Sequence, residues 1–191
     1  KSEATSKTIY YLPDGSYILS ETENGKSYQN MLTTNLTLIG NKDKFYLRNT
    51  LNTEWKWHRI DLMTQNDKNL IQEKAYMPSH KVSNNFNLVK RLRNQSISFS
   101  SFILWQSTPN TLDIFTDEKE KQIQSVSTFF LFNNNHAIYS FTLGKFILSL
   151  NGGINFLLRQ MDSNQQNNHI PVEGDLLYND IQTNYIRSYL N

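Results

Sequence analysis

The stretch Glu54–Arg59, with the sequence EWKWHR, holds the densest set of side chains that could do chemistry. On a β-strand alternate side chains point to opposite faces, so Trp55, Trp57 and Arg59 would share one face. Two tryptophans at this spacing form a flat apolar wall, and an arginine beside them could meet a carboxylate or stack on a π-system. The pattern predicts a pocket for an aromatic or carboxylated ligand. The alternative is a barrel core capped by the arginine.

Aromatic residues from later segments would extend such a pocket. Phe99 and Trp105 share one face of the expected strand 96–106, with Ser96, Ser98 and Ser100 on the other, and Phe130 lies in a second alternating segment. Near the start of the chain, Lys7 offers another cation for an acidic group on a ligand. The predicted ligand-binding set is therefore Trp55, Trp57, Arg59, Phe99, Trp105, Phe130 and Lys7. A basic cluster at Lys90, Arg91 and Arg93 could attract an acidic partner, or could be a solvated strand face.

No stretch of the chain carries a catalytic or metal-binding motif. The four histidines lie in separate segments, without His, Asp or Glu at metal-ligand spacing. The absence of cysteine excludes disulfides, thiolate zinc sites and a cysteine nucleophile. We therefore predict no metal site and assign no catalytic residue. If the protein is an enzyme, Glu54 or Asp61 is the nearest candidate for a proton donor.

These residues must be positioned by strands, because alternating and β-branched or aromatic segments recur along the chain. Turn residues separate them, among them Asn24-Gly25, Gly40–Asp43, Asn133–Asn135 and Asn151–Gly153. Nine or ten strands in sequence order predict an all-β, antiparallel meander that closes into a lipocalin-like barrel. We expect one domain over 1–191, with the barrel at 8–161 and a polar linker at 162–172. Apolar spacing then predicts a C-terminal α-helix over 173–190.

Composition limits the classes of partner. The 191 residues carry 19 Lys+Arg against 17 Asp+Glu, and this near balance argues against nucleic acid as the main partner. No run of 18 apolar residues is present, so we expect no transmembrane segment and a soluble chain. Richness in Asn, Lys, Phe and Tyr is typical of an AT-biased gene, which suits a plastid or a low-GC bacterium.

Two segments are similar to parts of the S-type phycobilin lyases, a lipocalin-like (calycin) family that attaches open-chain tetrapyrroles to phycobiliproteins. Ser6–Tyr11 resembles the opening element of that family, and Thr128–His136 resembles its late aromatic pair and turn. The resemblance implies a bilin as ligand and a phycobiliprotein as partner. Lys7 stands where the family has arginine, and Ala137–Tyr139 replaces an Arg-Leu-Arg element. Groups that would hold bilin propionates are thus missing, which implies a non-catalytic member.

The expected function is therefore a non-enzymatic, lipocalin-like module that binds a small hydrophobic or tetrapyrrole-like ligand, or a partner protein. One alternative is an S-type lyase that attaches a bilin. A further alternative is a structural subunit of a larger assembly, with a filled barrel.

Overall fold

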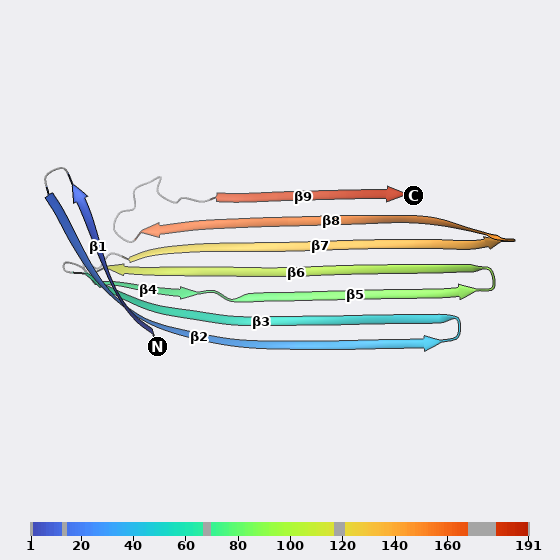
Figure 1. Ribbon diagram of the computed structural model, residues 1–191, viewed down its shortest axis with the longest axis horizontal. Helices are drawn as coiled ribbons and strands as arrows, with labels where there is room; N and C mark the ends of the chain where they lie inside the picture. Colours follow the sequence, from blue (N-terminus) through green and yellow to red (C-terminus); the bar gives the residue numbers. More distant parts are fainter. Residues whose placement is uncertain (1, 13–14, 67–69, 117–120, 168–178, 191) are drawn as a thin grey trace.

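The computed structural model describes all residues except 1, 13–14, 67–69, 117–120, 168–178 and 191 (Figure 1). The described residues form one antiparallel sheet of nine strands. Their bounds are β1 (Ser2–Leu12), β2 (Gly15–Lys42), β3 (Phe45–Asn66), β4 (Leu70–Tyr76), β5 (Ser79–Leu92), β6 (Gln95–Thr116), β7 (Lys121–Leu143), β8 (Phe146–Asn167) and β9 (Asn179–Leu190). The predicted all-β antiparallel meander is confirmed.

Strands β4 and β5 lie end to end, and both pair with β3 on one side and β6 on the other. The break between them falls at Met77 and Pro78. Proline has no N–H for a strand ladder, which explains why regular pairing stops there. The N–H of Met77 still donates to the carbonyl oxygen of His58 at 2.8 Å, so the two strands keep one alignment across the break.

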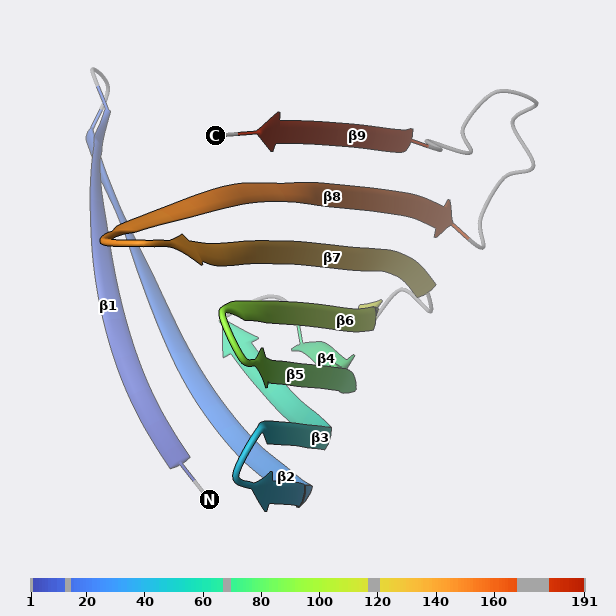
Figure 2. The same cartoon turned by 90° about the vertical axis from the view of Figure 1, so that its right-hand side faces the viewer.

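The sheet has two free edges among the described strands. Its order runs from β1 through β2, β3 and the β4–β5 pair to β9, and no pairing among these residues joins β1 to β9. In Figure 1 strands β2 to β9 run side by side, while β1 and the first part of β2 turn away from the others. Figure 2 shows the same open arrangement from the side. Closure into a barrel therefore stays a prediction.

The C-terminal helix predicted over 173–190 is wrong for residues 179–190, which form β9. This strand pairs with β8 from Ser163↔Asn179 to Gly152↔Leu190. Without β9, the edge of β8 would present a row of unpaired N–H and C=O groups, and pairing with that row outweighs a helical spacing of apolar residues. Residues 173–178 lie outside the described part of the chain. The expected linker also starts too early, because β8 continues to Asn167.

Three predicted turns lie in the middle of strands. Asn24-Gly25 falls inside β2, Asn133–Asn135 inside β7 and Asn151–Gly153 inside β8. These residues are paired with a neighbouring strand on both sides, except Asn151, which pairs with β7 alone, and this pairing overrides the local turn preference. The chain instead reverses at Asp43-Lys44, Arg93-Asn94 and Gly144-Lys145. Gly144 has φ of 60°, a conformation that glycine adopts without steric cost.

The sheet is a single layer without a buried core. Among the residues whose burial is described, no hydrophobic side chain is buried, and many large ones are exposed. Backbone ladders and contacts between neighbouring side chains therefore stabilise the strands, with no second layer packed on either face. Soluble domains usually bury at least one face of a sheet. The covering of these faces is thus the main physical question that the fold poses.

Gly153 provides a test of the β8–β9 register. A Cβ atom at Gly153 would lie 2.7 Å from the Asn135 carbonyl oxygen and 2.7 Å from the Tyr189 hydroxyl oxygen. We expect Gly153→Ala to lower the free energy of unfolding by about 1–3 kcal/mol, because neighbouring backbone and the Tyr189 ring must shift. Urea titration followed by circular dichroism measures this change.

Gly40→Ala is the matched control, because its nearest neighbour would be the Phe45 ring at 3.6 Å. We expect this variant to differ from the parent by no more than about 1 kcal/mol. Tyr189→Ala in the Gly153→Ala background should recover part of the loss. Equal stability of the two glycine variants would contradict the register.

Candidate functional site

The strand register sorts the side chains onto two faces. Directly paired residues of an antiparallel ladder point to the same side, and neighbours along a strand alternate. Trp55 pairs with Leu32 and His80, so these three residues lie on one face, which we call the apolar face. Glu54 pairs with Thr33 and Lys81 on the other face, which we call the polar face.

A broad strip of the apolar face is predominantly hydrophobic, with polar residues interspersed, among them Asn49, Asn84, Asn133 and Asn135. It runs across strands β2 to β9, from the turns at 43–44, 93–94 and 144–145 to the level of Trp55 and Trp57. We call this strip the apolar band. Its hydrophobic members are Leu32, Leu36, Leu38, Phe45, Leu47, Leu51, Trp55, Trp57, Val82, Phe86, Leu88, Leu92, Ile97, Phe99, Ile103, Trp105, Phe129, Leu131, Ala137, Tyr139, Phe141, Leu143, Phe146, Leu148, Leu150, Ile154, Phe156, Leu158, Ile186 and Leu190. Among the residues whose burial is described, the exposed large hydrophobic side chains belong to this face, with five exceptions: Met31, Ile39, Ile147, Ile181 and Tyr185.

The same face becomes charged where the band ends. Beyond Trp57, β3 presents Arg59 and Asp61, joined by an Arg59 Nε to Asp61 Oδ1 contact of 3.0 Å. On β6 and β7, Asp113 and Lys121 form a second pair at 3.3 Å. Asp162 and Asp180, which pair with each other on β8 and β9, stand at the level of Trp57. The first charged residues thus fall at different rows, with Asp162 and Asp180 at the level of Trp57, Asp113 at that of Asp61 and Lys121 at that of Met63.

All three tryptophans of the chain lie on the apolar face near this border. Trp55 and Trp57 come from β3, and Trp105 on β6 pairs with Val82, which pairs with Thr53. Trp55 packs against His80 with ring centroids 4.8 Å apart. Tyr28 and Tyr76, both paired with Arg59, lie one step further along the same face. The border therefore carries a belt of amphipathic aromatic side chains.

The polar face carries most of the hydrogen bonds between side chains at the level of the band. Asn35 donates to Asn52, Asn87 donates to Asn85 at 2.8 Å, and Ser140 and Ser149 bond at 2.8 Å. Lys56 Nζ lies 2.8 Å from Glu54 Oε1. Two shallow hollows of about 380 and 280 Å³ open among such residues, including Asn52, Glu54 and Lys81 in the first and Arg48, Asn85 and Phe102 in the second. This face is suited to water or to polar solutes.

The structure divides the predicted ligand-binding residues. Trp55, Trp57, Arg59, Phe99 and Trp105 share the apolar face. Phe99 lies six residues from Trp105 along β6, which is about 20 Å in an extended strand. Arg59 is engaged with Asp61. The possible proton donors, Glu54 and Asp61, are on opposite faces.

Phe130 and Lys7 lie apart from the tryptophans. Phe130 pairs with Gln106 on the polar face, where the Arg159 guanidinium carbon is 5.8 Å from its ring centroid. The backbone of Lys7 pairs with Ser20, twelve residues along β2 from Leu32, the partner of Trp55. That separation is about 40 Å. One small ligand cannot contact the whole predicted set in this arrangement, and the ligand-binding role of these residues stays a prediction.

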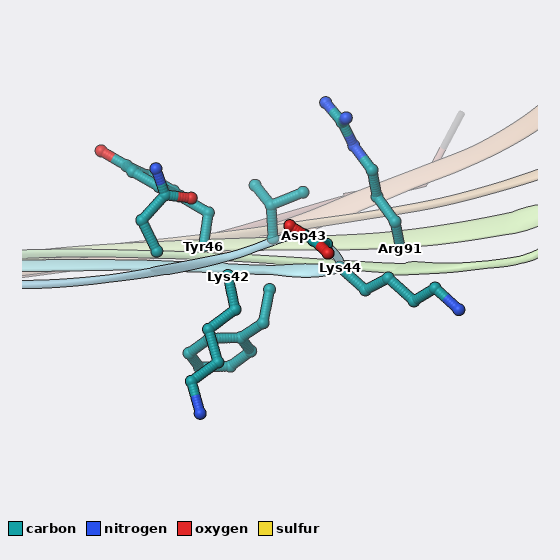
Figure 3. Close-up of a pocket in the computed structure, with 8 residues that line it drawn as sticks. Lys42, Asp43, Lys44, Tyr46 and Arg91 are labelled. Carbon is teal, nitrogen blue, oxygen red and sulfur yellow. The ribbon is translucent and has the colours of Figure 1, made fainter.

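Sequence reasoning missed a cluster of cations at the turn end of the sheet, which we call the basic rim. It consists of Lys42, Lys44, Lys90, Arg91, Arg93 and Lys145. In Figure 3, Arg91 and Tyr46 point to one side of the sheet, Lys42 to the other, and Lys44 extends outward from the β2–β3 turn. A hollow of about 380 Å³ is lined there by residues of the β2–β3 turn together with Val89 and Arg91. Only the Lys90–Arg93 part was visible as a cluster in the sequence.

No helix among the described residues is long and apolar enough to cross a membrane. Within the same residues, no group of three or more His, Asp or Glu side chains could hold a metal ion.

Comparisons with known proteins give no family. No protein-family profile matches the sequence, and no curated protein matches it. Among solved structures, the chain is similar to the ferric yersiniabactin uptake receptor FyuA from Yersinia pestis, with 7% identity and a TM-score of 0.43. The match covers 91% of this chain and 25% of that one, so this chain spans a quarter of the receptor's length.

Two further solved structures, OccAB3 and OccAB2 of Acinetobacter baumannii, have 8% and 9% identity and TM-scores of 0.14 and 0.15. These matches cover 93% and 92% of this chain, and 79% and 78% of the other chains. Scores at these levels do not establish a shared fold, and the architecture above rests on the strand pairing of this chain alone.

A double-mutant cycle tests the separation of the faces. We expect Phe130→Leu and Arg159→Met to show a coupling energy of about 0.5–1 kcal/mol in stability, the usual size of an exposed cation–π contact. The matched cycle of Phe129→Leu with Arg159→Met should show none, because Phe129 points to the opposite face. Denaturant unfolding of the single and double variants supplies the values. Equal coupling in the two cycles would refute the assignment.

Proposed function

We propose that this chain forms part of a membrane-embedded β-sheet wall, with the apolar band against lipid hydrocarbon and the polar face toward an aqueous space. The observation that carries the proposal is the contrast between the two faces at one level of the sheet. One face is predominantly hydrophobic and exposed, and the other carries mostly asparagine, serine, threonine and charged side chains, with Phe102, Phe130 and Phe132 among its hydrophobic members. Membrane-spanning strands alternate in this way between lipid and lumen.

The height of the band fits a bilayer. From Phe45 to Trp57, β3 advances by twelve residues. At about 3.4 Å per residue and a tilt near 45°, this segment spans roughly 29 Å along the membrane normal, close to the ~30 Å hydrocarbon core. Beyond Trp57 the strands continue into the charged region, which would lie outside the hydrocarbon.

Charge and aromatic placement support the same orientation. The charged residues of the apolar face within the band lie at its two ends: Lys42 and Lys90 share the row of Phe45 near the turns, and Asp162 and Asp180 stand at the level of Trp57. Lys90 lies one row from the strand ends. The lysine stem is long enough to bring its ammonium to the membrane surface. Tryptophan and tyrosine prefer the interface between hydrocarbon and water, which is where Trp55, Trp57 and Tyr28 would sit.

The free edges imply that the wall is incomplete by itself. Strand β1 pairs with β2 only over residues 15–25, so β2 forms the edge of the sheet at the level of the band. Unpaired N–H and C=O groups in hydrocarbon cost several kcal/mol each, so the edges at β2 and β9 must pair with further strands in a membrane. This requirement favours the alternative of a structural part of a larger assembly. Binding of a small hydrophobic or bilin-like ligand, in the manner of a lipocalin, has less support because its predicted residues lie on both faces. Bilin attachment is supported by no contact among the described residues.

Tryptophan fluorescence provides the first test. We expect phosphatidylcholine brominated on its acyl chains to quench the three tryptophans, because all lie at the edge of the band. Iodide in the aqueous phase should quench them much less in vesicles than after unfolding in urea. Tryptophans in a ligand pocket open to water would not be quenched by the brominated lipid, and iodide would quench them nearly as strongly in vesicles as after unfolding. That result would reject the membrane proposal.

Lysine substitutions on the two faces provide the second test. Leu36 lies in the middle of the band and is 60% exposed, and its neighbour Asn35 points to the polar face. We expect Leu36→Lys to destabilise the inserted state by about 2–4 kcal/mol, the cost of a cation near the bilayer centre. Asn35→Lys is the matched control and should cost less than about 1 kcal/mol. Folding titrations in phosphatidylcholine vesicles measure both, and equal costs would contradict the assignment of faces.

A further inference from the structure

The basic rim brings together cations from three turns that are far apart in sequence. Lys42 and Lys44 come from the β2–β3 turn, Lys90, Arg91 and Arg93 from the β5–β6 turn, and Lys145 from the β7–β8 turn. Across 41–46, 89–97 and 139–151, the single acidic residue is Asp43. The residues of all three turns are exposed. This end of the sheet therefore has a strong excess of positive charge, although the chain as a whole carries only +2.

Backbone contacts hold the three turns next to one another. The N–H of Arg91 donates to the carbonyl oxygen of Lys44 at 2.8 Å, and the N–H of Thr142 donates to that of Asn94 at 2.8 Å. The turns that carry the cations thus lie side by side along one end of the sheet. Cations gathered at one end attract anions more strongly than isolated lysines do, because the individual potentials add.

The rim directly borders the apolar band. Lys42 and Lys90 both pair with Phe45, so these two lysines flank an aromatic ring on the apolar face. Phe141 and Leu92, both paired with Gln95, lie one row closer to the turn. A ligand that suits this junction has an anionic group next to hydrocarbon. A free inorganic anion would satisfy the cations alone.

The opposite border of the band differs. There the charged residues occur in both signs, and Arg59 and Lys121 are paired with Asp61 and Asp113. Asp162 and Asp180 add negative charge at the same border. An anionic surface would therefore be attracted to one end of the band and not to the other.

We propose that the basic rim binds the phosphate groups of anionic lipid headgroups and thereby sets which leaflet the turn end occupies. This inference deepens the proposed function and depends on the apolar band lying in a bilayer. Lys42 would contact phosphates from the band side and Lys44 from the β2–β3 turn, in line with their positions in Figure 3. Attraction of basic residues to anionic leaflets falls off within a Debye length, so it is sensitive to salt.

The test compares two triple variants that remove equal charge. The rim variant is Lys42→Gln, Lys44→Gln and Lys90→Gln, and the control is Lys26→Gln, Lys74→Gln and Lys81→Gln, which lie away from the rim. Flotation measures binding to vesicles of phosphatidylcholine alone and to vesicles in which a quarter is phosphatidylglycerol. We expect the rim variant to lose about 5-fold per lysine of the preference for anionic vesicles, on the order of 100-fold in total. The control should keep its preference to within a few-fold.

Each outcome bears on the proposal. Equal losses in the two variants would mean that net charge alone sets the preference, and an unchanged rim variant would mean that the rim takes no part. Competition by millimolar inorganic phosphate at constant ionic strength would indicate a soluble anion as the ligand, which also overturns the lipid assignment. Failure of the parent protein to enter phosphatidylcholine would refute the membrane wall. The rim assignment is read separately, from the ratio of binding to the two vesicle types.

Discussion

Pairing of the backbone along very long strands is the interaction on which the whole molecule depends. The described sheet has no second layer and no buried hydrophobic side chain, so tertiary packing across layers does not hold it together. Strands of 22 residues or more, such as β2, β3 and β8, satisfy their backbone groups through continuous ladders. Even β9, whose side chains are mostly exposed, keeps a full register with β8.

The same ladders transmit order from strand to strand. Because each register is continuous, a side chain on β3 has counterparts on β2, β5, β6, β7 and β8 at one level of the sheet. The apolar band, the aromatic border and the basic rim are all products of this alignment. Gly153 illustrates how closely the strands fit, since the Tyr189 ring of β9 lies over a position where any side chain would collide with it. Aromatic residues that cover glycines in this manner are a known device for fixing register.

A sheet with one hydrophobic and one polar face needs an apolar environment on one side and water on the other. A second sheet or a helix layer usually provides the apolar side in soluble domains, whereas hydrocarbon provides it in membranes. The chemistry at the two borders, aromatic with mixed charge on one side and basic on the other, gives the sheet a direction.

The sequence by itself determined the all-β class, the antiparallel meander and the shared face of Trp55, Trp57 and Arg59, because alternation within one strand is a local property. The tertiary structure alone decided which strands are continuous, since Asn133–Asn135 and Asn151–Gly153 become turns or mid-strand residues according to their neighbours. It also decided that 179–190 is a strand, because the edge of β8 supplies hydrogen-bond partners that a helical pattern does not reveal. The opposite faces of Phe130 and Trp105, and the assembly of the basic rim from three turns, follow from register between strands. Register depends on residues far apart in the chain, and no single segment encodes it.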